Sequence, residues 1–182
     1  RRSQLLSDDG IISAALPIPL EVTDDPCFVL MSATGLLART TGDVPLEFAK
    51  KRTNHDTIRS MVRTTARGDV GIVTSFGRVI RQSVVSLPAL SEGAALSAAG
   101  GVALKEFLTL GKGETALSLM ALDQPESTLF LTTAFGTVKR VVNDVPASAG
   151  DWNVIRLEEG DYLVGAIQCE DESGEVVLIS SD

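Results

Sequence analysis

Short apolar segments alternate with polar turns along the chain, and one pattern of segment, turn and segment occurs three times. The clearest copy spans 129–142, where two apolar segments flank a turn at Phe135-Gly136 and the basic pair Lys139-Arg140 follows. Residues 73–81 repeat this pattern, and residues 31–39 repeat it more loosely. Short apolar segments joined by a tight turn are typical of β-hairpins, so the sequence predicts three similar hairpins.

Polar residues keep a fixed register to the turn glycine of each hairpin. A serine or threonine stands three residues before the glycine, and an arginine stands four residues after it. The three sets are Ser32, Gly35 and Arg39; Thr74, Gly77 and Arg81; and Thr133, Gly136 and Arg140. A two-residue hairpin loop requires a positive φ, which glycine adopts at little steric cost, so each turn is predicted to be such a loop.

A second landmark indicates a longer period. Gly113-Glu114 and Gly160-Asp161 each open an apolar run, at 115–122 and 162–169. Their spacing of about 47 residues is typical of propellers, solenoids and similar repeat arrays. Residues 176–182 have the pattern of a strand approaching another turn, so the chain is expected to end inside a repeat.

The remaining segments predict further strands and almost no helix. Residues 58–65 and 70–74 are separated by a tight turn and are expected to form one hairpin. Residues 84–90 are expected to leave the sheet because of Pro88, and 104–108 has room for one short helical turn. No long segment has the helical period, so the fold class predicted from the pattern is an all-β array.

Composition is compatible with one domain of ordinary size, or part of a larger one, in the cytoplasm. The chain has 182 residues, of which 44% are apolar and only 4% are aromatic, so the core must be aliphatic. No apolar run reaches the roughly 20 residues of a membrane span, and the start lacks the apolar core of a signal peptide. Cys27 and Cys169 lie in or beside apolar runs and are predicted to be two buried free thiols.

Charge is distributed unevenly along the chain. The net charge of −8 argues against an indiscriminate nucleic-acid binder, but basic residues outnumber acidic ones over 36–82, while acidic residues dominate 150–182. Arginines repeated along one edge of an array would suit the phosphates of a polyanion, because phosphate contacts need position and charge but no base-reading geometry. The alternative is that each arginine pairs with an acid of the next blade.

Catalytic chemistry is not evident in the sequence. His55 is the only histidine, so a His-based triad or a multi-histidine metal site is excluded, and it is interpreted as a surface or DNA-adjacent residue. Tyr162 is the only tyrosine and is interpreted as a packing residue. Residues 111–114 lack the spacing of a phosphate-binding loop, and the acidic run 170–172 lacks that of a calcium loop. We therefore expect this chain to be non-catalytic by itself.

The pattern of apolar strand, Ser or Thr, turn glycine and a basic residue shortly after it resembles the C-terminal domain of bacterial type IIA topoisomerase A subunits, those of DNA gyrase and topoisomerase IV. The resemblance covers the chain from about Cys27, and residues 1–26 resemble a lead-in from an upstream domain. It implies a β-pinwheel, a propeller-like array of repeated antiparallel blades forming an incomplete disc over 27–182. The expected repeats are 27–57, 58–112, 113–159 and the incomplete 160–182.

One departure from the family pattern bears on function. In gyrase, a basic, glycine-rich box follows the first repeat of this domain, and the corresponding segment here is 49–56. This segment has the basic residues Lys50, Lys51 and Arg52 but lacks the paired glycines. The departure favours a topoisomerase IV-like protein and argues against gyrase-type wrapping of DNA.

The resemblance implies a cytoplasmic, nucleoid-associated module that binds and bends duplex DNA for ATP-dependent strand passage in relaxation and decatenation. Its partners would be double-stranded DNA and, through upstream domains, the topoisomerase B subunit. ATP and Mg²⁺ would act elsewhere in the parent enzyme, so no cofactor is expected here. The alternatives are a gyrase wrapping domain and a propeller-type protein-interaction module. The candidate DNA-binding residues are Arg39, Lys50, Lys51, Arg52, Arg63, Arg67, Arg78, Arg81, Lys139 and Arg140.

Overall fold

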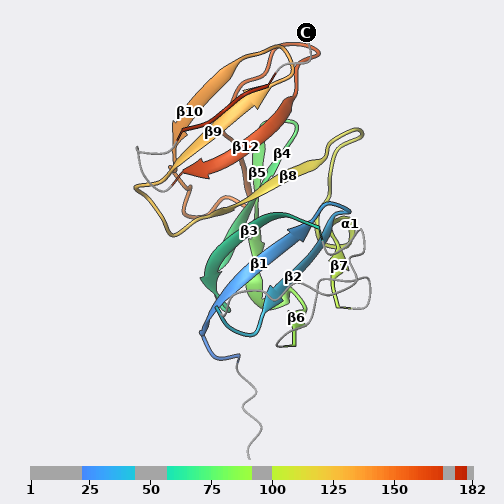
Figure 1. The fold of residues 1–182 in the computed structure, drawn as a ribbon, viewed down its shortest axis with the longest axis vertical. Coiled ribbons are helices and arrows are strands. Elements are labelled where there is room, and N and C mark those ends of the chain that lie inside the picture. Colours follow the sequence, from blue (N-terminus) through green and yellow to red (C-terminus); the bar gives the residue numbers. More distant parts are fainter. Residues whose placement is uncertain (1–21, 44–56, 92–99, 170–174, 180–182) are drawn as a thin grey trace, which may run out of the picture.

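Three β-sheets, mostly antiparallel, follow one another along the long axis of the molecule (Figure 1). The structure is a computed structural model that describes residues 22–43, 57–91, 100–169 and 175–179. Its strands are β1 (Pro26–Ser32), β2 (Leu36–Thr40), β3 (Ile58–Thr65), β4 (Asp69–Thr74), β5 (Arg78–Ser83), β6 (Ala89–Leu90), β7 (Val102–Ala103), β8 (Ala116–Ala121), β9 (Thr128–Thr133), β10 (Val138–Val142), β11 (Asp151–Asn153) and β12 (Leu163–Cys169). The predicted all-β fold class is confirmed.

Each sheet combines a hairpin with a strand from later in the chain. The hairpins are β1–β2, β4–β5 and β9–β10, and the returning strands β3, β8 and β12 pair with the first strand of the hairpin. The returning strands therefore form one edge of each sheet. Each sheet is called a blade below: blade 1 contains β1 to β3, blade 2 contains β4, β5 and β8, and blade 3 contains β9, β10 and β12.

The opposite edge of blades 1 and 2 is covered by strands from later in the chain. β6 pairs in parallel with β2, and β7 pairs antiparallel with the same strand. β11 pairs antiparallel with β5. Residues 84–90 thus leave their own sheet as predicted, through the short 3₁₀ turn Val84–Ser86, but they then extend the preceding blade. These exchanges link successive blades by backbone hydrogen bonds.

The predicted hairpin between residues 58–65 and 70–74 is wrong. β3 pairs with β1, and β4 pairs with β5 and β8, so the two strands belong to different blades. The apolar side chains Val62 and Val70 enter the same core cluster. The turn between β3 and β4 therefore connects two sheets that stack face to face. Stacking the apolar faces of these two strands removes more apolar surface from water than pairing their edges in one sheet would.

The turn glycines have the predicted positive φ, at 77° for Gly35 and Gly77 and 84° for Gly136. The predicted two-residue loop is nevertheless wrong. In each turn the glycine N–H donates to the carbonyl three residues earlier, that of Ser32, Thr74 or Thr133, so the glycine closes the turn. Type I′ and II′ loops require positive φ at central positions, and no non-glycine residue in the described ranges has one.

Three apolar clusters hold the blades together. The first lies between blades 1 and 2 and includes Leu37, Ile72 and Leu119, all nearly inaccessible to solvent. The second lies between blades 2 and 3, around Val79 and Leu131. The third lies on the other face of blade 1. Aliphatic residues dominate all three, as the low aromatic content predicted.

Smaller elements agree with the sequence in part. The predicted helical turn is α1 (Leu104–Phe107). In the described part of the chain no helix is long and apolar enough to cross a membrane. Both cysteines are free thiols, but only Cys27 is buried, because Cys169 lies at the end of the edge strand β12.

Tyr162 is 49% exposed, which corrects its interpretation as a packing residue. Its backbone carbonyl accepts from the Ala134 N–H, while its ring stays at the surface.

Candidate nucleic-acid interface

The arginines four residues after the turn glycines occupy the same place in every blade. Arg39, Arg81 and Arg140 lie on β2, β5 and β10, and their pairing partners on the first hairpin strand are Val29, Gly71 and Phe130. Each arginine lies on the same strand face as the residue two positions earlier. In blades 1 and 2 these residues are Leu37 and Val79, which pack towards the next blade. The structure therefore confirms that the three arginines lie at equivalent positions in the three hairpins.

Arg81 is bound to the segment that follows β10. Its Nε donates to the Ala149 carbonyl at 3.1 Å, and a terminal nitrogen donates to the Pro146 carbonyl at 2.6 Å. The other terminal nitrogen lies 3.3 Å from Asp69, and the guanidinium lies 5.7 Å from the centre of the Trp152 ring. Arg81 therefore fastens blade 2 to the chain of the next repeat. The acid it contacts comes from its own blade, not from the next one.

Arg39 is half-buried and lines a cavity of about 300 Å³ with Cys27. Its Nε is buried and has no hydrogen-bond partner among the described residues. Burial raises the pKa of the Cys27 thiol, and the nearby Arg39 charge partly opposes this effect. Cys27 therefore stays protonated at neutral pH.

Arg140 and Lys139 are exposed on β10. The Nε of Arg140 donates to the Thr128 hydroxyl at 3.0 Å across the β9–β10 pair. No strand pairs with the outer edge of β10 in the part of the chain that the structure describes. These two side chains can reach a partner in solvent without rearrangement of the sheet.

Arg78 lies in a charged cluster that sequence reasoning missed. Its guanidinium donates to both carboxylate oxygens of Glu114 at 2.7 and 2.8 Å and to Asp151 at 2.6 Å. The Glu114 side chain is only 1% exposed. Hydrogen bonds from Arg78 lower the pKa of Glu114 to about 2, so this carboxylate is charged at neutral pH. The signal in the sequence was the Gly113-Glu114 landmark, whose spacing indicates a period but not an ion pair.

The other candidates are less constrained. Arg63 is exposed and forms an ion pair with Asp43 at 2.8 Å, while Arg67 is exposed at the turn after β3. Lys50, Lys51 and Arg52 lie outside the described residues, as does His55. The structure therefore divides the described candidates into two kinds. Arg78 and Arg81 bind other parts of the chain, whereas Arg63, Arg67, Lys139 and Arg140 are solvent-exposed; Arg39 is intermediate.

Side chains from the neighbouring blades also bind the free edge of β8. Ser60 Oγ of β3 accepts from the Leu119 N–H at 2.9 Å. Gln168 of β12 accepts from the Ala121 N–H at 2.7 Å and donates to the Ala121 carbonyl at 3.0 Å. These bonds join all three blades along the edge of the returning strands, and nothing in the local sequence pattern predicted them.

Comparison with solved structures identifies the fold. The C-terminal domain of E. coli ParC superposes with a TM-score of 0.58 and 20% sequence identity, over 81% of this chain and 58% of that domain. The C-terminal domain of DNA topoisomerase IV superposes with a TM-score of 0.61 and 16% identity, over 82% of this chain and 47% of the other. A DNA gyrase A C-terminal domain has a TM-score of 0.48 at 18% identity, over 80% of this chain and 48% of that domain.

The chain therefore spans about half the length of the solved domains that it resembles. No protein-family model and no curated protein sequence matches it. The architecture shared with these solved domains is the stacked-blade β-pinwheel.

Proposed function

We propose that this chain is a DNA-binding module of a type IIA topoisomerase A subunit, and that it bends duplex DNA and presents it for strand passage. The observation that carries the proposal is the set of solvent-exposed cations on β10 and after β3, on a fold shared with two topoisomerase C-terminal domains. Exposed cations suit backbone phosphates, because phosphate contacts need position and charge but no base-reading geometry.

The direct phosphate contacts are assigned to the exposed cations Lys139 and Arg140 on β10 and Arg67 in the turn after β3. Arg78 and Arg81 act mainly by holding the blades at a fixed spacing, because their donors bind Glu114, Asp151 and backbone carbonyls. Lys50, Lys51 and Arg52 remain candidate contacts on the sequence argument alone. Within this function we favour a topoisomerase IV-like role in relaxation and decatenation, because the basic box lacks the paired glycines of gyrase.

The first experiment is a mobility-shift titration of this chain with a duplex over a range of salt concentrations. For B-DNA, the logarithm of the binding constant falls with the logarithm of salt by about 0.9 for each phosphate neutralised. A slope that corresponds to several phosphates supports the proposal. Binding that is absent at low salt, or independent of salt, contradicts it.

A second readout separates the two topoisomerase types. A relaxed circle is ligated in the presence of the chain and its linking number is measured. Binding with little change in linking number supports a weakly wrapping, topoisomerase IV-like module. A strong positive change would favour a gyrase-type wrapping domain instead.

The basic segment at 50–52 gives a third test. Reversing the charges of Lys50, Lys51 and Arg52 together should lower duplex affinity and reduce the salt slope without changing the unfolding temperature. Reversal of the exposed Arg156, which is not in the candidate set, is the matched control. Unchanged affinity and slope in the triple variant would remove this segment from the interface.

A further inference from the structure

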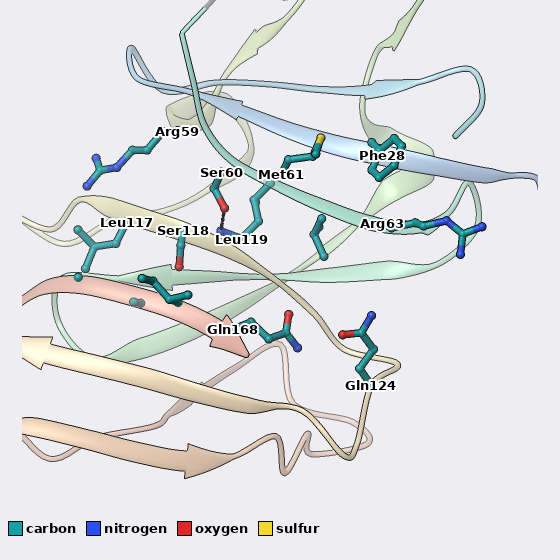
Figure 2. A pocket seen from close by; sticks show the side chains of 14 residues that line it. Phe28, Arg59, Ser60, Met61, Arg63, Leu117, Ser118, Leu119, Gln124 and Gln168 are labelled. Carbon is teal, nitrogen blue, oxygen red and sulfur yellow. Dashed lines mark hydrogen bonds between the residues drawn. The ribbon is translucent and has the colours of Figure 1, made fainter. Parts of the chain in front are cut away.

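A groove of about 600 Å³ lies where the returning strands of the three blades meet (Figure 2). β3 forms one side, and β8 and β12 form the floor and the opposite side. It contains none of the exposed cations of β10. Its principal lining residues are Phe28, Arg59, Met61, Arg63, Ser118 and Ile167.

The strands around this groove are sheet edges. β3, β8 and β12 each end their sheet in the described part of the chain. Edge strands present unpaired N–H and C=O groups, which readily bind another extended segment. Some of the β8 groups are already occupied by Ser60 and Gln168, which shows that backbone groups at this edge accept ligands from outside their own sheet.

Three exposed side chains on one face of β3 line the rim of the groove. Arg59, Met61 and Arg63 alternate with less exposed residues, and Figure 2 places Met61 between the two arginines. A strand rises about 3.3 Å per residue, so the two guanidinium-bearing positions are ~13 Å apart along β3. A strand added beside β3 would have its own same-face side chains opposite these three.

Arg59 and Arg63 can form ion pairs with the carboxylates of a bound segment. No ion pair of Arg59 is present among the described residues, and Arg63 is paired only with the exposed Asp43, at 2.8 Å. Exposed pairs of this kind contribute little, so a partner carboxylate can replace Asp43 with little loss of free energy. Ser118 is 8% exposed, and its hydroxyl is buried beside the groove without a hydrogen-bond partner in the described ranges.

We infer that this groove binds an extended acidic segment of a partner protein, laid beside β3 with two carboxylates facing Arg59 and Arg63 and an apolar side chain against Met61. The alternation of a strand places residues one, three and five of such a segment on one face. The recognition rule is therefore two acidic residues four positions apart with an apolar residue midway between them. This inference does not rest on the proposed binding of DNA.

The test uses the complete chain and two fluorescent peptides of equal composition. The first, Thr-Glu-Thr-Leu-Thr-Glu-Thr, has both carboxylates on one face of an extended strand. The second, Thr-Glu-Thr-Leu-Glu-Thr-Thr, has them on opposite faces. Fluorescence anisotropy should show that the first binds at least roughly fivefold more tightly, the ratio expected if one exposed charge pair is lost.

Variants locate the site. Arg59→Glu and Arg63→Glu should each abolish the preference for the first peptide, and Met61→Asp should weaken both peptides. Asp43→Asn should strengthen binding because it removes the competing carboxylate. Lys139→Glu, a charge reversal on blade 3, is the matched control and should leave peptide binding unchanged.

Equal affinity for the two peptides, or no binding of either, overturns the inference. It is also overturned if inorganic phosphate displaces the peptide as well as excess peptide does, because the groove would then be a simple anion site. Displacement by duplex DNA that depends on Arg59 would assign the groove to the nucleic-acid interface instead. The proposed DNA binding is tested by a separate measurement, the salt slope of duplex binding by the Lys139 and Arg140 variants.

Discussion

Blades 2 and 3 use the same hairpin, but their second strands have different surroundings. In β5, Val79 is fully buried, β11 covers the outer edge, and Arg81 binds carbonyls of the next repeat. In β10 the equivalent Val138 is 44% exposed, and both Lys139 and Arg140 face solvent. The equivalent position therefore helps to hold neighbouring blades together where the next repeat covers it, as in blade 2. Where no described segment covers it, as in blade 3, its side chain lies at the surface.

This comparison changes how a repeated cation should be interpreted. The pattern of an arginine four residues after each turn glycine says where the side chain lies, but not what it binds. The binding partner depends on whether a later segment of the chain reaches that position. We therefore expect substitutions in blade 2 to change stability and substitutions on β10 to change DNA affinity.

The largest expected effect is at Glu114. Glu114→Ala leaves Arg78 without its buried partner, and breaking a buried pair typically destabilises a protein by about 3 kcal/mol or more. Asp161 ends the equivalent turn in the next repeat, where it accepts from the Phe135 N–H at 3.0 Å and is partly exposed. Asp161→Ala should therefore lower the free energy of unfolding much less than Glu114→Ala does. Urea unfolding of both variants measures the difference, and equal losses would contradict the comparison.

The same cluster predicts a dependence of stability on pH. The pKa of Glu114 is about 2 in the folded chain, below its ordinary value of 4.5. A carboxyl whose pKa is lower in the folded chain than in the unfolded chain stabilises the fold at pH values above its unfolded-state pKa. This contribution is lost as the pH falls towards the folded-state pKa. We expect a loss of up to roughly 3 kcal/mol between pH 5 and pH 2. Glu114→Gln should remove this part of the pH dependence; an unchanged profile would show that other carboxyls are responsible.

The turn glycines provide a matched pair of smaller changes. Gly77 and Gly136 both have positive φ, so alanine is strained at either position by about 1 kcal/mol. A Cβ at Gly77 would also lie 2.7 Å from Ile155 Cγ2, whereas a Cβ at Gly136 meets nothing within 4 Å. Gly77→Ala should therefore lower the unfolding free energy by about 1 kcal/mol more than Gly136→Ala does. Thermal unfolding of the two variants distinguishes these outcomes, and equal shifts would show that the contact relaxes freely.

A stability difference of similar size is expected between two equivalent arginines. Arg81→Ala removes three hydrogen bonds and the contact with Trp152, and we expect a loss of about 1–2 kcal/mol. Arg140→Ala changes an exposed side chain and should stay within about 0.5 kcal/mol of the parent. Chemical denaturation gives both values. A larger loss for Arg140 would indicate that β10 is covered in solution.

Much of the fold followed from local pattern. The strands, the turn glycines and the register of Arg39, Arg81 and Arg140 depend on alternation and on the conformational freedom of glycine, and both are visible in short segments of sequence. The exchange of β6 and β11 between blades and the pairing of β3 with β1 were not predictable in this way. They depend on which apolar faces stack, which is a property of residues distant in the chain such as Val62 and Leu119.

The candidate site shows the same limit. The positions of the cations were predictable, but apart from Asp69 the partners of Arg78 and Arg81 lie more than thirty residues away, in Glu114, Pro146, Ala149 and Asp151. No local signal assigns a guanidinium to a distant carbonyl. The groove beside β3 was missed for a related reason, because it forms only where three returning strands meet.

The most direct test of this division between binding and cohesive cations is the salt dependence of duplex binding by two variants measured side by side. Lys139→Glu combined with Arg140→Glu should reduce the slope by about 0.9 for each lost phosphate contact, with little change in stability. Arg81→Ala should lower stability and leave the slope unchanged, provided that binding is measured where the variant is folded. The division is contradicted if the double variant keeps the parent slope, or if Arg81→Ala lowers it as much as the double variant does.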